Sequence, residues 1–172
     1  AKSIGSSFSD AGSSIALDGA GNVYVAGYFL DTADFDPGAD TANLTSIGSY
    51  DIFFAKYDAS GNYLWAKSIG STTTDDGFSI AVDNTGNVYV IGRYSGTADF
   101  DPGAGNFNLT PIGNYDIFFA KYSQTQVSIN DPGYSGVDKI LLYPNPNTGL
   151  FTLELVLNKV NELHVKITNI LG

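Results

Sequence analysis

The chain has 172 residues and a formal net charge of −10, from 8 basic and 18 acidic side chains. A pI near 4.1 argues against a nucleic-acid or anionic-membrane surface, because phosphate contacts need clustered Lys and Arg. Without cysteine the chain has no disulfides, thiolate zinc sites or cysteine catalysis, and its single histidine, His164, excludes most hydrolase triads. No stretch approaches the roughly 18–20 apolar residues of a membrane helix.

The chain begins with alanine and contains no methionine. We therefore expect it to be a piece of a longer protein, with any signal peptide lying upstream.

An internal repeat with an offset of 65 residues occupies the first 122 positions. Residues 1–57 align without a gap to residues 66–122, and 39 of the 57 pairs are identical. The segment from Thr32 to Ala39 returns as Thr97 to Ala104, and Tyr50 to Tyr57 returns as Tyr115 to Tyr122. A repeat of this length indicates an architecture built from stacked supersecondary units.

Each unit is predicted to contain four short antiparallel strands in two hairpins. In the first unit these are residues 14–17, 22–26, 52–57 and 63–68, which are rich in β-branched, aromatic and small residues. The hairpins turn at Asp-x-x-Gly-Asn, beginning at Asp18, Asp58 and Asp83. There Asp bonds the turn backbone and Gly supplies a positive φ. Residues 30–49 are predicted to be a long polar connection.

Four-stranded units in tandem favour a β-propeller. The order Trp-Ala-Lys-Ser-Ile-Gly, Gly-Asn-Val-Tyr-Val and Asp-Ile-Phe-Phe-Ala-Lys-Tyr resembles the SBBP family of bacterial β-propeller repeats, over residues 1–122. The Ala-Asp-Phe-Asp-Pro-Gly insert resembles the version found in secreted Bacteroidetes proteins. Residues 1–5 look like the last strand of a preceding blade. Two units make an incomplete ring, which indicates either an N-terminal truncation or completion of the ring by self-association.

The pattern breaks after Tyr122, so we divide the chain into a propeller region at 1–128 (units 1–65 and 66–128), a linker at 129–137 and a tail at 138–172. In the tail, Phe151, Leu153 and Leu155 alternate with polar residues, which predicts a strand. Residues 163–170 alternate less regularly and predict a second strand.

The tail resembles the first half of the C-terminal sorting domain of the type IX secretion system, an immunoglobulin-like β-sandwich. This resemblance rests on the motif Tyr143, Pro144, Asn145, Pro146 and Gly149, together with Val-Lys-Ile-x-Asn-Ile-Leu-Gly at residues 165–172. It implies export across the outer membrane through the secretion machinery. The protein would then be released or attached to the cell surface.

One candidate metal site is the Asp-Phe-Asp-Pro-Gly sequence, which places Asp34 and Asp36 in the first unit and Asp99 and Asp101 in the second. Carboxylates two residues apart on an extended loop point the same way, and oxygen ligands suit calcium. The alternative is a turn capped by Asp, with Phe35 and Phe100 packed inward. No other cofactor is indicated.

The remaining carboxylates and aromatic residues are expected to be structural. Asp10, Asp51, Asp75, Asp76 and Asp116 precede strands, where we expect them to accept backbone hydrogen bonds, a catalytic pair being the alternative. The recurring tyrosines favour core packing over a sugar-stacking surface.

The sequence therefore predicts an all-β protein of tandem propeller blades with a partial β-sandwich tail. We expect a non-enzymatic, secreted or surface-attached module that binds a protein or a glycan. Two alternatives stay open, which are the accessory propeller of a larger secreted enzyme and a structural adhesin spacer.

Overall fold

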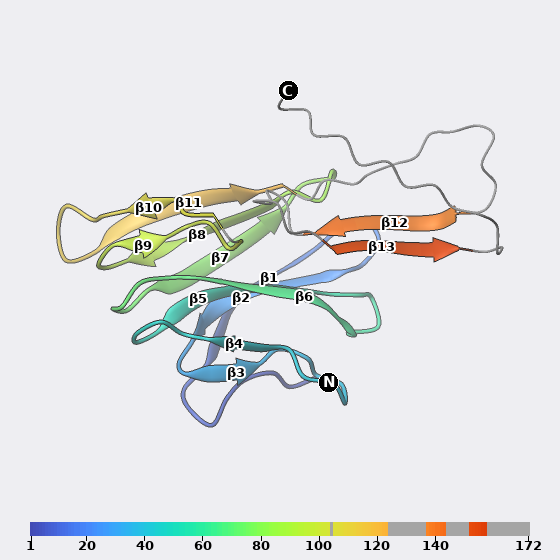
Figure 1. The fold of residues 1–172 in the computed structure, drawn as a ribbon, viewed down its shortest axis with the longest axis horizontal. Coiled ribbons are helices and arrows are strands. Elements are labelled where there is room, and N and C mark those ends of the chain that lie inside the picture. The colour runs from blue at the N-terminus through green and yellow to red at the C-terminus, as the bar shows by residue number, and fades with distance from the viewer. Residues whose placement is uncertain (104, 124–136, 144–151, 158–172) are drawn as a thin grey trace.

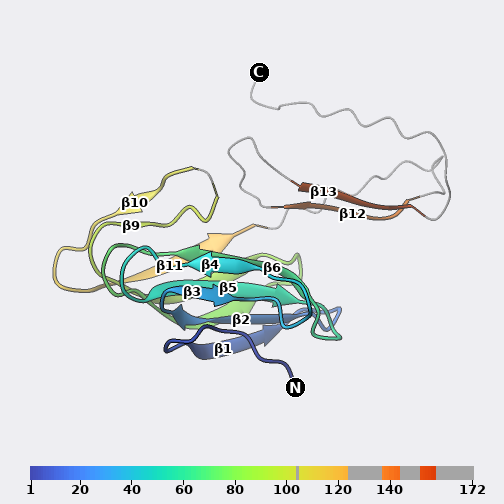
Figure 2. The ribbon, with the colours of Figure 1, turned by 60° about the horizontal axis from the view of Figure 1, so that its bottom comes forward.

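The computed structural model describes residues 1–103, 105–123, 137–143 and 152–157. Within these ranges every regular element is a β-strand and every strand pair is antiparallel, which confirms the predicted all-β class (Figures 1 and 2). The strands are β1 (Ala11–Leu17), β2 (Val23–Phe29), β3 (Thr32–Asp34), β4 (Asn43–Thr45), β5 (Asp51–Tyr57), β6 (Tyr63–Ile69), β7 (Asp76–Val82), β8 (Val88–Tyr94), β9 (Ala98–Asp99), β10 (Asn108–Leu109), β11 (Asp116–Tyr122), β12 (Val137–Tyr143) and β13 (Thr152–Leu157).

The first repeat unit forms a four-stranded sheet in the order β1-β2-β5-β6. Each strand pairs with the next of the four along the chain, so the sheet is a meander in which β3 and β4 are an insertion between β2 and β5. Both faces of β5 are buried, because four of its residues from Ile52 to Ala55 are at most 3% exposed. A strand covered on both faces needs the continuous apolar run that this segment has.

The hairpin turns have the predicted chemistry. In the β1–β2 turn, Asp18 Oδ1 accepts hydrogen bonds from the backbone N–H groups of Ala20 and Asn22, at 2.9 and 3.0 Å. Gly21 has a φ of 81°, in the left-handed region that glycine enters without steric cost. The turns at Asp58 and Asp83 repeat this arrangement with their own glycines. These side-chain bonds set the register of each hairpin.

The predicted polar connection between β2 and β5 contains two short strands that were not predicted. Within it, β3 and β4 pair as a short two-stranded sheet with Thr32 opposite Thr45. The two threonine hydroxyls are 2.8 Å apart and hydrogen-bonded. Tyr57 on β5 donates its hydroxyl to the carbonyl of Phe35 at 3.0 Å, which ties this inserted hairpin to the parent sheet.

The second repeat unit forms a three-stranded sheet in the order β11-β8-β7, with a β9–β10 pair in place of β3–β4. Strands β7, β8 and β11 start 65 residues after β1, β2 and β5. The positions equivalent to β6 are residues 128–134, which lie outside the described residues.

The two sheets pack through one apolar core. Tyr24, Ile52 and Phe54 of the first sheet meet Val90, Phe118 and Tyr122 of the second, and all six are less than 9% exposed. The approach is close, since a Cβ built on Gly77 of β7 would lie 2.7 Å from the carbonyl oxygen of Gly27 on β2. The chain thus stacks one sheet on the next, as propeller-like blades of an incomplete ring do.

A separate two-stranded sheet contains β12 and β13, with Tyr143 opposite Thr152. Strand β13 matches the strand predicted from the alternation around Leu153 and Leu155. Strand β12 begins at Val137, the last residue of the predicted linker, and it was not predicted as a strand. The second predicted tail strand, at residues 163–170, lies outside the described residues.

Candidate binding surfaces

The Asp-Phe-Asp-Pro-Gly loops use their carboxylates to bond their own backbone. Asp34 Oδ1 accepts from the N–H groups of Asp36 at 3.0 Å and Ala42 at 2.9 Å, and Asp36 Oδ1 accepts from Gly38 at 2.7 Å. These backbone bonds hold the pKa of Asp34 below its ordinary value. In the second unit, Asp99 Oδ1 accepts from the N–H groups of Asp101 and Phe107, and Asp101 Oδ1 accepts from the N–H of Gly103.

The neighbouring phenylalanines point into the protein, as the capped-turn alternative predicted. Phe35 is 1% exposed and Phe100 6%. Among the described residues, no group of three or more acidic or histidine side chains is placed to hold a metal ion. Each loop therefore offers a paired carboxylate at most, and calcium binding stays a prediction for experiment.

Asp10 in the first unit and Asp75 in the second each connect the residues before the first strand of the unit to the residues after its second strand. Asp75 Oδ2 accepts from the Ser71 N–H and hydroxyl at 2.6 and 2.8 Å, and its Oδ1 accepts from the Ser95 N–H at 2.9 Å. Asp10 contacts Ser6 and Leu30 in the same way. These carboxylates accept backbone donors, as the sequence interpretation expected.

Among the described residues, Asp51 is the one buried carboxylate that leaves an oxygen without a hydrogen-bond partner. It is 1% exposed, and its Oδ2 accepts from the Ile47 N–H at 3.0 Å while its Oδ1 has no hydrogen-bond partner. The pKa of Asp51 is raised to about 7, mainly by burial, which outweighs the lowering by the bond from Ile47, and the nearby charge of Asp75 contributes to the rise. Asp116, its counterpart in the second unit, accepts from Ile112 and is less buried.

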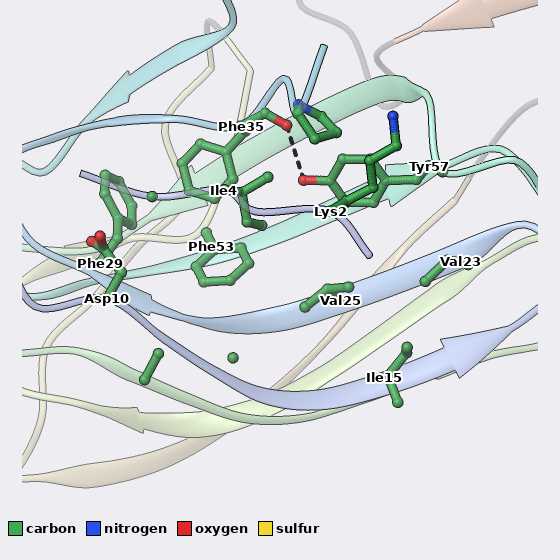
Figure 3. A pocket seen from close by; sticks show the side chains of 15 residues that line it. Lys2, Ile4, Asp10, Ile15, Val23, Val25, Phe29, Phe35, Phe53 and Tyr57 are labelled. Atoms are coloured by element: carbon green, nitrogen blue, oxygen red, sulfur yellow. Dashed lines mark hydrogen bonds between the residues drawn. The ribbon is translucent and has the colours of Figure 1, made fainter.

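A pocket of about 440 Å³ lies on the open face of the first sheet (Figure 3). Its wall is mainly apolar and includes Ile4, Ile15, Val25, Phe29, Phe53 and Tyr57. Figure 3 places Lys2 beside Tyr57 and Asp10 at the opposite end, near Phe29. The pocket has an apolar floor and one charged side chain of each sign at its rim. It therefore suits an apolar partner surface better than a small charged ligand.

The second sheet exposes an apolar face on the side away from the first. Its large side chains are Tyr89, Ile91, Ile117 and Phe119, which are 39%, 46%, 80% and 90% exposed. Contiguous apolar side chains with such exposure mark an interaction surface on a soluble protein.

An arginine with two aromatic rings lies at the edge of this face. Arg93 on β8 pairs with Asp76 at 2.7 Å, and its guanidinium lies over the ring of Tyr115 at 4.5 Å. The ring of Phe78 is 5.9 Å away on β7, where a β-bulge between Gly77 and Ser79 interrupts the alternation of side chains. The first unit has Ala11, Ser13, Tyr28 and Tyr50 at these four positions, so the cluster belongs to the second unit alone.

Sequence reasoning did not find this cluster, because its members are spread over 40 positions of the chain. The available signal was the repeat alignment itself, in which Tyr28 becomes Arg93. The expectation that recurring tyrosines pack in the core holds for Tyr24 and Tyr57, which are 0% and 6% exposed. At Tyr89 and Tyr115 the rings are instead open to solvent.

Most of the predicted sorting motif cannot be placed. Tyr143 is the last residue of β12, while Pro144, Asn145, Pro146 and Gly149 lie outside the described residues. No helix in the described part of the chain is long and apolar enough to cross a membrane.

The architecture defines a class of all-β proteins in which antiparallel sheets stack as successive blades. Residues 64–100 match the β-propeller repeat family called SBBP. The match begins in β6 of the first sheet and runs through β7, β8 and β9, so the family's repeat starts with the outer strand of one sheet and continues into the next. The chain therefore carries a β-propeller repeat.

Two curated proteins are also similar in sequence. A WD repeat-containing protein of Acanthamoeba polyphaga mimivirus is 34% identical over 112 residues, which is 57% of this chain and 8% of that protein. Regulatory protein FlaEY of Caulobacter vibrioides is 26% identical over 123 residues, 72% of this chain and 12% of that protein. The chain thus spans only a small fraction of the length of these relatives.

Proposed function

We propose that the chain is a non-catalytic binding module of a secreted or surface-attached protein, with two SBBP-type units that present a ligand site and a sorting tail that directs export. The observation that carries the binding role is the cluster of Arg93, Tyr115 and Phe78. Arginine and tyrosine dominate the energetics of protein interfaces, because both combine a large flat contact area with hydrogen-bonding capacity. A protein ligand fits this cluster best.

Two further observations support the role of a scaffold. Asp76 holds the Arg93 guanidinium in place, so less side-chain entropy is lost when a ligand binds. Tyr28 and Tyr50, at the equivalent positions of the first unit, remain partly exposed beside the second sheet. This edge of a blade therefore stays accessible even when the adjoining face is covered.

The binding role is tested with the full chain immobilised on a sensor. The probes are the extracellular proteins and, separately, the surface polysaccharide of a bacterium that has type IX secretion. We expect saturable binding to the protein fraction, weakened at least tenfold by Arg93→Ala with Tyr115→Ala. Ile112→Ala, at a fully exposed site outside the cluster, is the control. Binding to polysaccharide alone would identify a glycan ligand, and no binding to either contradicts the proposal.

The export role needs a separate test. The full chain and a deletion of residues 138–172 are expressed behind the same leader in a host with this secretion system. We expect the tagged full chain on the cell surface or in the medium, and the deletion variant in the periplasm. Equal export of both forms would show that the tail is not a sorting signal.

A further inference from the structure

The two repeat units meet in a contact between two loops at one end of the sheets. We call this contact the joint. It is formed by residues 46–51, which lead into β5, and residues 70–76, which link β6 to β7. The Asp75 N–H donates to the carbonyl of Tyr50 across the joint at 2.7 Å. A Cβ built on Gly48 would lie 2.3 Å from the backbone of the second loop, so the two loops touch directly.

The joint encloses one carboxyl group that is not fully satisfied. Asp51 is 1% exposed, and its Oδ2 accepts from the Ile47 N–H at 3.0 Å, while its Oδ1 has no hydrogen-bond partner. A Cβ on Gly70 would lie 2.4 Å from the Asp51 Cγ and 2.5 Å from its Oδ1, so the backbone of the second loop lies directly against the carboxyl. One oxygen of Asp51 is therefore cut off from water and from protein donors.

The groups around Asp51 do not stabilise a negative charge on it. Phe29 lies opposite Asp51 on β2, and β6 is followed by a glycine at this point, so neither neighbouring strand presents a charge. The second loop contributes Asp75, which is itself buried and whose negative charge acts on Asp51. Asp76, the next residue, pairs with Arg93. Within the described ranges, neither Asp51 nor Asp75 forms an ion pair.

The hydrogen bonds decide which of the two carboxyl groups holds a proton. Asp75 accepts three bonds, from the Ser71 N–H and hydroxyl and from the Ser95 N–H. Burial raises the pKa of Asp75, and these three bonds counter the rise. Asp51 accepts one bond only, so burial beside a second negative charge favours its neutral form. The closed joint therefore holds one charge, on Asp75, and one proton, on Asp51.

We propose that the joint is a proton-controlled contact between the two units, closed while the Asp51 carboxyl is protonated and opened when that proton is lost. An ionised Asp51 in the closed joint has a charged oxygen without a donor, next to the charge of Asp75. Movement of residues 70–76 away from β5 admits water to this oxygen and separates the two charges. The inference concerns the contact between the units and is independent of the ligand and the export route.

The direction of the pH dependence follows from the two forms of Asp51. Its pKa is about 7 in the closed joint, whereas the pKa of an aspartate in water is about 4. The closed form holds the proton more tightly, so its advantage is complete below about pH 4 and is lost as the pH rises to about 7. Over that range the ratio of open to closed forms rises about tenfold per pH unit, and above it the ratio levels off.

The test measures amide hydrogen exchange of the full chain by NMR at pH 5, 6, 7 and 8, corrected for the intrinsic exchange rate at each pH. The reporter is the Asp75 N–H, because its acceptor lies on the other side of the joint. We expect its protection to fall by up to about a hundredfold between pH 5 and pH 8. The Asn22 N–H is bonded inside the β1–β2 turn, away from the joint, and is the internal reference.

Two variants hold the joint in one form each, and a third is the control. Asp51→Asn keeps the enclosed side chain uncharged, so the Asp75 amide should stay protected up to pH 8. Gly70→Ala places a methyl group against the Asp51 carboxyl, so protection should be low at every pH. Asp116→Asn, at the equivalent position of the second unit and outside the joint, should reproduce the profile of the unmodified chain.

Trp65 separates opening of the joint from loss of the fold. It is the single tryptophan, lies near the start of β6 away from the joint, and packs against the core between the sheets. Its emission and the circular dichroism should stay constant from pH 5 to pH 8. The proposal is overturned if the protection of the Asp75 amide falls no more than that of Asn22, or if Asp51→Asn keeps the full pH dependence. A shift of the Trp65 emission over the same pH range also overturns it, because the whole interface would then separate.

Discussion

Phe54 on β5 stacks on Tyr122 on β11, with ring centroids 4.7 Å apart and planes 18° from parallel. The two rings belong to different repeat units and occupy different positions of the repeat. The contact therefore joins a face of the first sheet to a face of the second, inside the core between them. Any further unit that follows the same geometry would use the same pair.

Removing one ring of this pair should weaken the interface between the sheets. Phe54→Ala deletes a side chain that is 1% exposed, so we expect the free energy of unfolding to fall by about 3–5 kcal/mol. Phe119→Ala changes the same residue type at the equivalent position, where the ring is 90% exposed. Its effect should stay within about 0.5 kcal/mol. Urea denaturation at low protein concentration measures both, and equal losses would show that the sheets do not pack as described.

The two bulge glycines offer a second matched pair. Gly77→Ala introduces a Cβ 2.7 Å from the Gly27 carbonyl oxygen, and because that atom is backbone the sheets must shift. Overpacking of this kind costs about 1–3 kcal/mol. Gly12→Ala, whose Cβ would meet only the Val25 side chain at an ordinary contact distance of 3.7 Å, should leave the melting temperature nearly unchanged. A melt of the Gly77 variant that coincides with the unmodified chain would contradict the close approach of the sheets.

The stability of the chain should depend on pH through Asp51. The pKa of Asp51 is raised to about 7 in the folded state, mainly by burial, whereas the pKa of an aspartate in the unfolded chain is about 4. The folded state therefore holds the proton more tightly, and the contribution of Asp51 to stability is lost as the pH rises from about 4 through 7.

Asp51→Asn removes this titration and keeps an oxygen to accept from Ile47. We expect thermal melts between pH 5 and 8 to show a smaller loss of stability in the variant than in the unmodified chain. Asp116→Asn, at the more exposed equivalent position, is the control. Parallel pH profiles for the unmodified chain and the Asp51 variant would show that this carboxyl titrates normally.

The aspartate loops are tested with calcium. If Asp34 with Asp36 and Asp99 with Asp101 bind the ion in the native state, calcium in excess of its dissociation constant raises the melting temperature. Replacing all four by Asn should abolish the rise. Coincident melts of the chelated and calcium-loaded chain would leave these loops as capped turns.

The elements predicted from sequence were those governed by local chemistry. The Asp-x-x-Gly-Asn turns need only neighbouring residues, because Asp18 bonds positions two and four further along. The strands beside them follow from β-branched and aromatic runs. The repeat offset then transfers the whole arrangement to the second unit, so the all-β class and the strands of both sheets were within reach.

The missed features depend on contacts across the fold. Strands β3 and β4 have three residues each, which is too short for a periodic pattern to reveal. Their pairing is secured by the Tyr57 hydroxyl, 22 positions from its acceptor. The Arg93 cluster depends on a bulge that turns Phe78 out of register, and a bulge leaves no periodic signal in a sequence.

The bond from Tyr57 to the Phe35 carbonyl has a counterpart in the bond from Tyr122 to Phe100. This bond fixes each inserted hairpin to its sheet directly after β3 or β9, and the loop that follows extends beyond this point. The two units already differ there, with Asp40, Thr41 and Ala42 replaced by Gly105, Asn106 and Phe107. Because the anchoring bond is the same in both units, the loop sequence beyond it can change without changing the residues that pack in the core. The surface of such a repeat can therefore vary while its fold is kept.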